Sequence, residues 1–311
     1  MKILVAGGAG FIGSHLCSAL LILGHSVVAI DNLYTGSFSN ISHLIQNPNF
    51  KFITRNVIFP FNWDEKFDFI FHLASPASPK WYQADPIGTI KSNVLGSFNL
   101  LEVAKDSKCG IFFSSTSEVY GDPKEHPQKE SYLGNVNCIG PRANYDESKR
   151  CAEAIFFEYH RVYGIDIKVA RFFNTYGPYM SQNDGRVVSN FIVNALKNED
   201  IFITGDGKQT RSFQYISDLI SAMVKFMNSN VHGPLNIGNP EEFTVLELAE
   251  KIISKTNSKS KIVFKEKVQD DPVLRCPDIT LAKSLINWQP KVKLTEGLDY
   301  TIDYFRNLTK S

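Results

Sequence analysis

Cysteine is rare in this 311-residue sequence, and its acidic and basic residues nearly cancel. The five cysteines are odd in number and lack the spacing of a metal-binding motif, which favours free thiols over disulfides and predicts no metal site. Free thiols are typical of a reducing compartment, so we expect a cytoplasmic protein. A formal net charge of +1 gives no reason to expect a nucleic-acid or membrane-surface partner.

Long apolar runs and targeting signals are also missing. No apolar stretch approaches the ~20 residues that a helix needs to span a bilayer, so we expect no membrane partner. The first residues run directly into a strand-like segment, without the basic region, apolar core and cleavage site of a signal peptide. Neither a repeat nor a low-complexity linker divides the chain, which at 43% hydrophobic residues is long enough for one large domain or two of ordinary size.

Segments typical of strands and of helices alternate over the first ~175 residues. Strand-like segments are expected at residues 2–6, 26–30, 50–54, 67–73, 111–115 and 167–172. Helices are expected after the first strand up to about residue 23, and at residues 86–105 and 143–163. This alternation predicts an α/β fold with a doubly wound parallel sheet that carries helices on both faces.

The pattern becomes less regular after Gly177. Helices are expected at residues 187–196, 217–227 and 245–253, with a strand at 235–237 and a final amphipathic helix near the end of the chain. Thr244 precedes the third of these helices as a cap. We therefore predict a first domain over residues 1–176 and a smaller α/β domain over residues 177–311. Some segments of the second are expected to cross back to the first, with a ligand cleft between them.

Gly7, Gly10 and Gly13 form a G-x-x-G-x-x-G turn between the first predicted strand and helix. Glycines allow a tight turn and a close approach to a pyrophosphate, and the helix N-terminus adds N–H donors and a positive dipole. Asp31 ends the second predicted strand, where a carboxylate accepts hydrogen bonds from ribose hydroxyls and repels a 2′-phosphate. The sequence therefore favours NAD over NADP as a cofactor. The alternatives are a glycine-rich turn without a ligand and an ordinary turn aspartate.

Tyr145 and Lys149 are four residues apart on a predicted helix, so they lie one above the other on one face. An ammonium beside a phenol is expected to lower the tyrosine pKa from ~10. The tyrosine could then take a proton from a sugar or alcohol hydroxyl near neutral pH. Tyr120 and Lys124 share this spacing, but Pro123 makes a regular helix unfavourable there.

The glycine turn followed by Tyr145 and Lys149 resembles the short-chain dehydrogenase/reductase superfamily. A narrower resemblance is to the UDP-glucuronate decarboxylases (UDP-xylose synthases) of its extended branch, and it covers residues 2 to about 290. The motifs that carry it lie at residues 72–79 (HLASPASP), 91–94 (KSNV), 114–123 (SSTSEVYGDP), 173–178 (FNTYGP), 184–191 (DGRVVSNF) and 205–215 (GDGKQTRSFQY). The resemblance implies a Rossmann-like NAD-binding domain followed by a nucleotide-sugar domain.

The resemblance also implies a reaction: NAD-dependent decarboxylation of UDP-glucuronate to UDP-xylose through a UDP-4-keto intermediate, with NAD regenerated in each cycle. Tyr145 is implied to take the proton of the C4 hydroxyl, while Lys149 lowers its pKa and holds the nicotinamide ribose. Thr116 is implied to hydrogen-bond the C4 oxygen, with Ser117 and Glu118 near C5 and C6. The 4-ketone makes the C6 carboxylate a β-keto acid, which loses CO2 as an enolate that nearby donors stabilise.

Further residues are assigned by position. Arg275, in the stretch 270–278 (DDPVLRCPD), matches the family's arginine near the substrate carboxylate and phosphates, and Asn174 and Arg211 are implied to hold the UDP. The predicted cofactor residues are Gly7, Gly10, Phe11, Ile12, Gly13, Asp31, Asn32, Asn56, Val57, Leu73, Ala74, Asn93, Tyr145 and Lys149. The predicted substrate residues are Pro79, Tyr82, Asn174, Arg186, Arg211, Tyr215 and Arg275.

Each assignment has an ordinary structural alternative. Arg211 and Arg275 could be solvated surface arginines, and Arg186 could form a simple ion pair. His72 ends an apolar strand and is expected to be a hydrogen-bonded structural histidine rather than an acid–base group. Tyr82 could equally be a core aromatic.

Three positions depart from the family pattern. Asn56 stands where the family has an aspartate facing the adenine amino group, and its amide oxygen can accept the same hydrogen bond. Asn144 and Ser148, on either side of Tyr145, differ from the residues of the animal and plant enzymes. None of these changes removes a functional group from the predicted mechanism.

Two other functions stay open. The first is another nucleotide-sugar enzyme of the extended family, a 4-epimerase or a 4,6-dehydratase. Ser117 argues against the dehydratase, which usually carries an aspartate before the glutamate, and a 4-epimerase needs no carboxylate at Glu118. The second is a non-catalytic dinucleotide-sensing protein, which would typically lack Tyr145 or Lys149. The family pattern also implies a homodimer in which the helix after Pro86 and the helix with Tyr145 pair with their symmetry mates.

Overall fold

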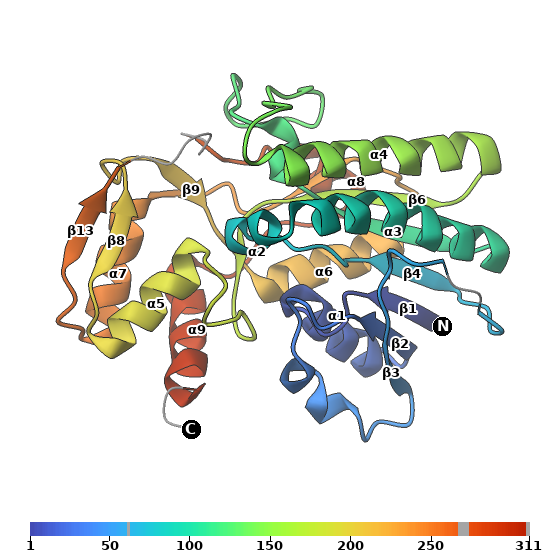
Figure 1. Ribbon diagram of the computed structural model, residues 1–311, viewed down its shortest axis with the longest axis horizontal. Coiled ribbons are helices and arrows are strands. Elements are labelled where there is room, and N and C mark those ends of the chain that lie inside the picture. Colours follow the sequence, from blue (N-terminus) through green and yellow to red (C-terminus); the bar gives the residue numbers. More distant parts are fainter. Residues whose placement is uncertain (61–62, 267–273, 309–311) are drawn as a thin grey trace.

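The computed structural model describes residues 1–60, 63–266 and 274–308. Its largest layer is a seven-stranded sheet in the order β11-β6-β5-β4-β1-β2-β3, and all pairs of neighbours are parallel (Figure 1). The strands are β1 (Lys2–Ala6), β2 (Ser26–Asp31), β3 (Phe50–Thr54), β4 (Phe69–His72), β5 (Gly110–Thr116), β6 (Ile167–Phe172) and β11 (Leu235–Ile237). The strand order reverses between β1 and β4, which is where open α/β sheets bind ligands at their carboxyl ends. The predicted α/β fold class is confirmed.

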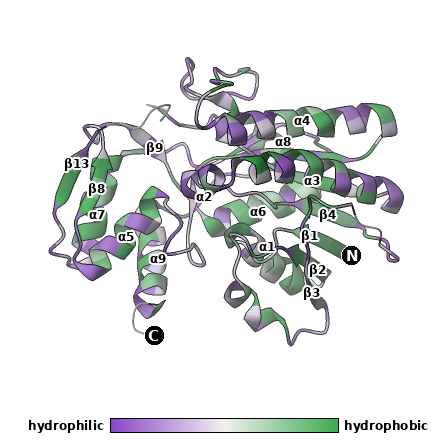
Figure 2. Cartoon of the chain, viewed as in Figure 1, coloured by the Kyte–Doolittle hydropathy of each residue, from purple (hydrophilic) through white to green (hydrophobic). Residues whose placement is uncertain are grey.

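Helices cover both faces of this sheet. On one face lie α1 (Phe11–Ile22), α6 (Ile216–Met227) and α8 (Thr280–Ile286), and on the other lie α3 (Pro86–Ser107) and α4 (Ala143–Tyr163). In Figure 1, α3 and α4 run side by side along the top of the sheet. Figure 2 shows the apolar residues concentrated on the strands, while the helices carry polar residues toward the outside.

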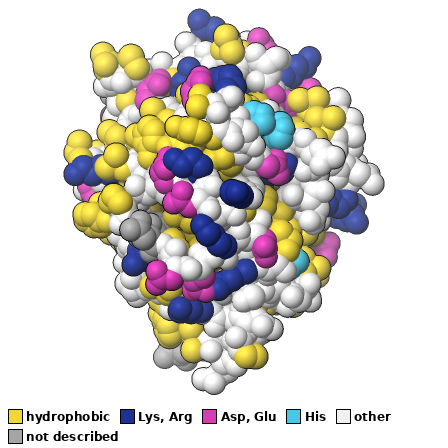
Figure 3. Space-filling view, turned by 90° about the vertical axis from the view of Figure 1, so that its right-hand side faces the viewer, with side chains coloured by type: hydrophobic (Ala, Val, Ile, Leu, Met, Phe, Trp, Pro, Cys, Tyr) yellow, Lys and Arg dark blue, Asp and Glu magenta, His cyan; other side chains and the backbone are white. Residues whose placement is uncertain are grey.

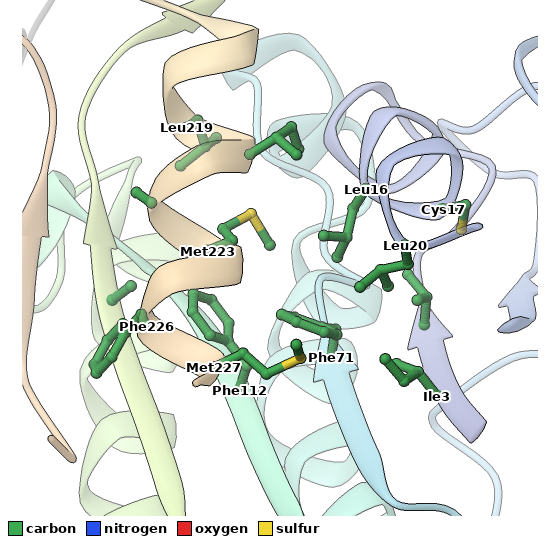
Figure 4. Close-up of a cluster of buried hydrophobic side chains, with 14 of the residues drawn as sticks. Ile3, Leu16, Cys17, Leu20, Phe71, Phe112, Leu219, Met223, Phe226 and Met227 are labelled. Atoms are coloured by element: carbon green, nitrogen blue, oxygen red, sulfur yellow. The ribbon is translucent and has the colours of Figure 1, made fainter. Parts of the chain in front are cut away.

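The core beneath α1 and α6 is built from large apolar side chains. Leu16 and Leu20 of α1 point toward Phe71 of β4 (Figure 4). Phe226 of α6 meets Phe112 of β5 edge to face, with ring centroids 5.7 Å apart. Each such side chain contributes roughly 1.5–3 kcal/mol when it is fully buried. The packing therefore joins α6 and β11, which come late in the chain, to the sheet formed by the first part. The domain boundary after residue 176 stays a prediction.

A smaller part of the fold lies at the left of Figure 1. It contains α5 (Val187–Lys197), α7 (Val245–Thr256), α9 (Leu294–Leu308) and the parallel pair β8 (Ile201–Thr204) and β13 (Ile262–Lys265), which share a separate apolar core. The remaining strands pair as β9 (Thr210–Ser212) with β12 (Glu242–Thr244) and β7 (Thr175–Tyr176) with β10 (Gln214–Tyr215). Thr244 and Glu247 form a capping box at the start of α7, in which the side chain of each accepts a hydrogen bond from the backbone N–H of the other. The predicted cap is therefore confirmed.

The predicted strands and helices are all present, with small shifts at their ends. The sequence pattern did not reveal α2 (Pro79–Ala84) or the short strands β7, β9, β10 and β12, which show no period, although it did predict β11. Tyr120 and Lys124, which share the four-residue spacing of Tyr145 and Lys149, do not lie on a regular helix. The 3-10 helix η3 (Ser117–Tyr120) ends before Pro123.

Two further findings concern the cysteines and the surface. All five cysteines are free. Among the described residues, no helix has the length and the apolar composition to cross a bilayer. On the face shown in Figure 3, basic and acidic side chains are interspersed with apolar ones, and neither sign of charge forms a continuous patch there.

Candidate active site

A cavity of about 860 Å³ lies between the sheet and the smaller part of the fold. Its walls come from the carboxyl ends of β1, β2, β4 and β5, from the start of α4, and from α5, β8 and β9. All the predicted site residues line it except Asn93 and Tyr215. The structure therefore gathers the predicted cofactor and substrate residues around one space.

The glycine turn forms one end of the cavity. A Cβ atom on Gly13 would lie 2.0 Å from the carbonyl oxygen of Gly7, and one on Gly7 would lie 2.8 Å from the backbone nitrogen of Ala74. Gly7 also has a φ of +84°, which favours glycine. No side chain caps α1, so its first N–H groups are left for an anion. This cradle fits the pyrophosphate of a dinucleotide.

Asp31 lies at the end of β2, beside the turn. Its carboxylate accepts hydrogen bonds from the backbone N–H groups of Ala9 (3.1 Å) and Leu33 (2.8 Å). Burial raises the pKa of Asp31 above its usual value, although these donors oppose the shift. Asn56 lines the same end, and its side-chain oxygen accepts a hydrogen bond from the Ile58 N–H at 3.1 Å. Both residues occupy positions that suit the adenosine end of NAD.

Asn93 and Tyr215 lie outside the cavity wall. The amide of Asn93 is fully buried between α3 and α4, where it donates a 2.8 Å hydrogen bond to the hydroxyl of Ser148. Tyr215 packs its ring against Tyr176 and Tyr300. The structure thus gives both side chains contacts within the protein, and Asn93 supports the helix that carries Tyr145.

Tyr145 is buried in the first turn of α4, with its ring stacked on Tyr82 at a centroid distance of 5.0 Å. The ammonium of Lys149 donates a 2.7 Å hydrogen bond to the Ser114 carbonyl and lies 5.8 Å from the Tyr145 ring centroid. Burial raises the pKa of Tyr145 above its usual value, while a hydrogen bond with Thr116 opposes the shift. Burial also lowers the pKa of Lys149 to about 7. The expected lowering of the Tyr145 pKa by Lys149 is therefore wrong for the protein alone, because desolvation dominates both groups.

The wall of the cavity also holds a largely buried ion-pair cluster around Glu118. Arg275 donates a 2.9 Å hydrogen bond to one carboxylate oxygen of Glu118, and Arg142 donates one of 2.5 Å to the other. Arg275 also donates to the hydroxyl of Ser117 (2.9 Å) and the carbonyl of Gly121 (3.0 Å). Arg275 is only 2% exposed, so the solvated-arginine alternative is wrong for it.

The cluster determines the charge of Glu118. Burial alone would raise the pKa of this carboxyl, but Arg275 and Arg142 outweigh burial and lower its pKa to about 2. Glu118 is therefore a carboxylate at neutral pH and a weak base. Arg142 was missed by the sequence analysis, although it lies three residues before Tyr145, close to the same helix face. Residues 270–273 of the stretch that contains Arg275 lie outside the described residues.

The remaining predicted residues have mixed surroundings. Arg186 lines the cavity and also pairs with Asp184 at 2.6 Å, so the ion pair is present and its contact with the substrate stays a prediction. Arg211 lines the cavity from β9.

His72 is buried, and neither of its ring nitrogens has a hydrogen-bond partner among the described residues. The expected hydrogen bond is thus wrong, and burial with the nearby Lys149 lowers the pKa of His72 to about 3, so its ring is neutral.

Several residues that sequence reasoning did not assign also line the cavity. Those from the smaller part of the fold include the apolar or aromatic residues Tyr179, Met180, Phe202, Phe213 and Tyr304. They come from turns, short strands and the last helix of the smaller part of the fold, so no local motif marks them.

Comparison with known proteins gives consistent matches. Residues 3–238 match the model of the NAD dependent epimerase/dehydratase family. The chain is 51% identical over 304 residues to UDP-glucuronic acid decarboxylase 1 of Danio rerio, covering 98% of this chain and 72% of that protein. It is 50% identical over 307 residues to UDP-glucuronic acid decarboxylase 1 of Arabidopsis thaliana, covering 99% of this chain and 70% of that protein.

Solved structures give the same overall picture. The UDP-glucuronic acid 4-epimerase of Bacillus cereus, in complex with UDP-glucuronic acid and NAD, is 32% identical with a TM-score of 0.90. The match covers 99% of this chain and 100% of that one. The UDP-glucose 4-epimerase of Thermotoga maritima, with UDP-glucose, gives the same identity, TM-score and coverage.

Proposed function

This chain belongs to the NAD dependent epimerase/dehydratase family and, within it, to the UDP-glucuronic acid decarboxylases, and from that membership we propose that it converts UDP-glucuronate to UDP-xylose and CO2. The observation that carries the proposal is about 50% identity to decarboxylases along nearly the whole chain, against 32% to a 4-epimerase that binds UDP-glucuronic acid. The Glu118–Arg275 pair supports it, because it brings a buried arginine to the same cavity as the glycine turn and Tyr145.

The first step removes a hydride from C4 of the sugar and a proton from the C4 hydroxyl group. When bound, NAD supplies a hydride acceptor and a positively charged ring. In the protein alone the phenol of Tyr145 is protonated, and a positive charge beside it lowers the pKa of a tyrosine. Tyr145 then takes the C4 hydroxyl proton, with Thr116 hydrogen-bonded to the same phenol oxygen. Lys149, whose ammonium is hydrogen-bonded to the Ser114 carbonyl, would hold the nicotinamide ribose, as the family resemblance implies.

The second step breaks the bond between C5 and the carboxylate. With a ketone at C4, the electrons of that bond move onto the C4 oxygen, where the hydroxyls of Tyr145 and Thr116 donate hydrogen bonds to the developing oxyanion. Glu118 stays ionised because its pKa is about 2, and with Arg275 and Arg142 it forms a cluster of net positive charge that suits the C6 carboxylate of the sugar. After CO2 has left, protonation at C5 and return of the hydride to C4 give the pentose and regenerate NAD. Arg275 and Ser117, which are hydrogen-bonded to each other, hold the cluster in place.

One experiment tests the proposed reaction against the 4-epimerase alternative. The purified protein is incubated with UDP-glucuronate and a catalytic amount of NAD, and CO2 and the sugar products are measured. We expect CO2 and UDP-xylose in equal amounts, without net consumption of NAD. Formation of the C4 epimer of UDP-glucuronate without CO2 would establish the epimerase instead, and turnover of UDP-glucose or dTDP-glucose alone would overturn the substrate assignment.

The proposal that the protein forms a homodimer is supported by an apolar stripe on α3. Ile87, Ile90 and Phe98 are large apolar side chains that are substantially exposed on this helix, and they recur at helical spacing. Val162 and Tyr163 are exposed at the end of the neighbouring α4. A helix pair with such a stripe gains stability by packing against its symmetry mate. Light scattering should give twice the chain mass of 35.0 kDa, and a monomer mass would refute the dimer.

Two further proposals concern location and domains. The free cysteines support a reducing, cytoplasmic location, which cell fractionation can test.

A boundary after residue 176 between a cofactor domain and a substrate domain is supported by the separate apolar core of the smaller part. Limited proteolysis in the presence and absence of UDP can test this division.

A further inference from the structure

Three side chains that are suited to metal binding meet outside the cavity, beside the segment that carries Arg275. They are His126, Glu242 and Cys276, and one potential ligand atom from each lies within 4.8 Å of the other two. They come from the loop after η3, from β12 and from the segment before α8. His126 and Glu242 are 116 residues apart, so no spacing motif in the sequence could reveal the cluster.

The three donors form a chemically consistent set for one divalent metal ion. An imidazole nitrogen, a carboxylate oxygen and a thiolate sulfur are the ligands that Zn²⁺ prefers. Ligand atoms of a tetrahedral zinc site are about 3.4 Å apart, given zinc–ligand distances of ~2.0–2.3 Å. Nε2 of His126 lies 2.9 Å from Oε2 of Glu242, and the side chain of His126 is partly exposed and can adjust. A thiolate and a carboxylate would together neutralise the charge of the ion.

Neighbouring groups hold two of the three ligands in place. Thr210 donates a 2.6 Å hydrogen bond to the other carboxylate oxygen of Glu242, which leaves Oε2 turned toward His126. The side-chain oxygen of Gln128 accepts a 2.9 Å hydrogen bond from the backbone N–H of Cys276, and the N–H of Gln128 donates to the Cys276 carbonyl at 2.8 Å. Supporting hydrogen bonds of this kind orient the ligands of metal sites.

A simple ion pair accounts for only part of this arrangement. A pair between His126 and Glu242, both partly exposed, contributes little to stability and needs no thiol. Cys276 is buried, and its Sγ lies 3.4 Å from the carbonyl oxygen of Pro240, to which the thiol donates. The side chain of Cys276 thus lies beside the His126–Glu242 pair, where an ion pair alone gives the sulfur no role.

We propose that His126, Glu242 and Cys276 form a binding site for one Zn²⁺ ion per chain. The metal displaces the thiol proton to solvent and forms bonds to sulfur, nitrogen and oxygen, and the fourth position is left for water. Three protein ligands and partial exposure make the ion exchangeable. The ion ties the loop at His126 and strand β12 to the residue that follows Arg275, so it fastens one wall of the cavity.

Cobalt provides a direct test, because a thiolate bound to Co²⁺ gives an intense ligand-to-metal absorption band. The full-length protein is stripped with a chelator and titrated with Co²⁺. We expect a band that saturates at one Co²⁺ per chain and disappears when Zn²⁺ is added. Cys276→Ser should abolish the band, while His126→Ala and Glu242→Gln should each weaken Co²⁺ binding by more than ~10-fold, the loss typical of even a supporting residue.

Matched variants make the test decisive. Cys138→Ser removes an exposed thiol elsewhere and should keep the band. If Cys276→Ser does not fold, the exposed position His126 still reports on the site, because its removal leaves the buried core intact. Zn²⁺ should also raise the Tm of the wild type and of Cys138→Ser but not of His126→Ala. No cobalt–thiolate band, a band that persists in Cys276→Ser, or equal affinity in His126→Ala would overturn the site.

Discussion

Replacing Glu118 by glutamine removes one charge from the buried cluster and leaves its shape unchanged. The carboxylate accepts hydrogen bonds from both Arg275 and Arg142, and its pKa is lowered from 4.5 to about 2. A difference of ~2.5 pKa units at ~1.4 kcal/mol per unit corresponds to about 3 kcal/mol of stabilisation of the ionised form. This agrees with the ~3–5 kcal/mol lost when one partner of a buried ion pair is removed. We therefore expect Glu118→Gln to lower the free energy of unfolding at pH 7 by about 3 kcal/mol.

The sign of the pH dependence follows from the lowered pKa. A carboxyl with a lower pKa in the folded state contributes stability above its unfolded pKa of ~4.5, and this contribution is lost as the pH falls toward about 2. Urea unfolding of the wild type and of Glu118→Gln should thus differ most near pH 7 and converge at low pH. In the exposed control Glu158→Gln, which removes a partner of Arg161, the unfolding curve should hardly change.

The same variant tests the role of Glu118 in the reaction. Without the negative charge, Arg275 and Arg142 lose the carboxylate that positions them, so they hold the sugar carboxylate less well. CO2 release should therefore slow while oxidation at C4 is retained. An unfolding free energy at pH 7 equal to that of the wild type would refute the ion-pair argument. Normal CO2 release from a variant that is destabilised as expected would remove Glu118 from the mechanism and leave it a structural residue.

Three further substitutions give separate predictions. Tyr145→Phe keeps the ring stacked on Tyr82 but removes the hydroxyl, and should slow NADH formation by about 10²–10⁴-fold; an unchanged rate would mean that another group is the base. Gly13→Ala places a methyl group 2.0 Å from the Gly7 carbonyl and should abolish NAD binding in calorimetry. In the control Gly24→Ala the Cβ meets nothing within 4 Å, so NAD binding should be retained, although the φ of +81° makes this variant somewhat less stable. Asn93→Ala removes the buried bond to Ser148 and should lower the free energy of unfolding by about 1–3 kcal/mol; a loss of NAD affinity without loss of stability would place Asn93 in the cofactor site.

The sequence predicted the fold well because local rules govern it. Alternating apolar segments marked the strands of the parallel sheet, and Pro86 and Thr244 marked the starts of two helices. The glycine turn was equally readable, since steric contact around Gly7 and Gly13 excludes any side chain. In each of these cases the residues that determine the structure are neighbours in the chain.

Contacts between distant residues were much harder to predict. The pair Glu118–Arg275 joins positions 157 residues apart, and only the resemblance to a family suggested that Arg275 belongs near the sugar. The third member, Arg142, carried no such signal and was missed. Asn93 and Tyr215 were assigned to the site because they lie in or next to matching motifs, yet a motif does not fix which way a side chain turns.

The protonation of Tyr145 and Lys149 shows most clearly what spacing leaves undetermined. Four residues on a helix fix the positions of two Cα atoms on one face, but the ammonium of Lys149 reaches the Ser114 carbonyl instead of the phenol. Both groups are also stripped of water by the core beneath α4, which favours their neutral forms and outweighs a charge interaction at this distance. The chain by itself therefore holds Tyr145 as an acid, and its use as a base requires a positive charge that a ligand brings into the cavity.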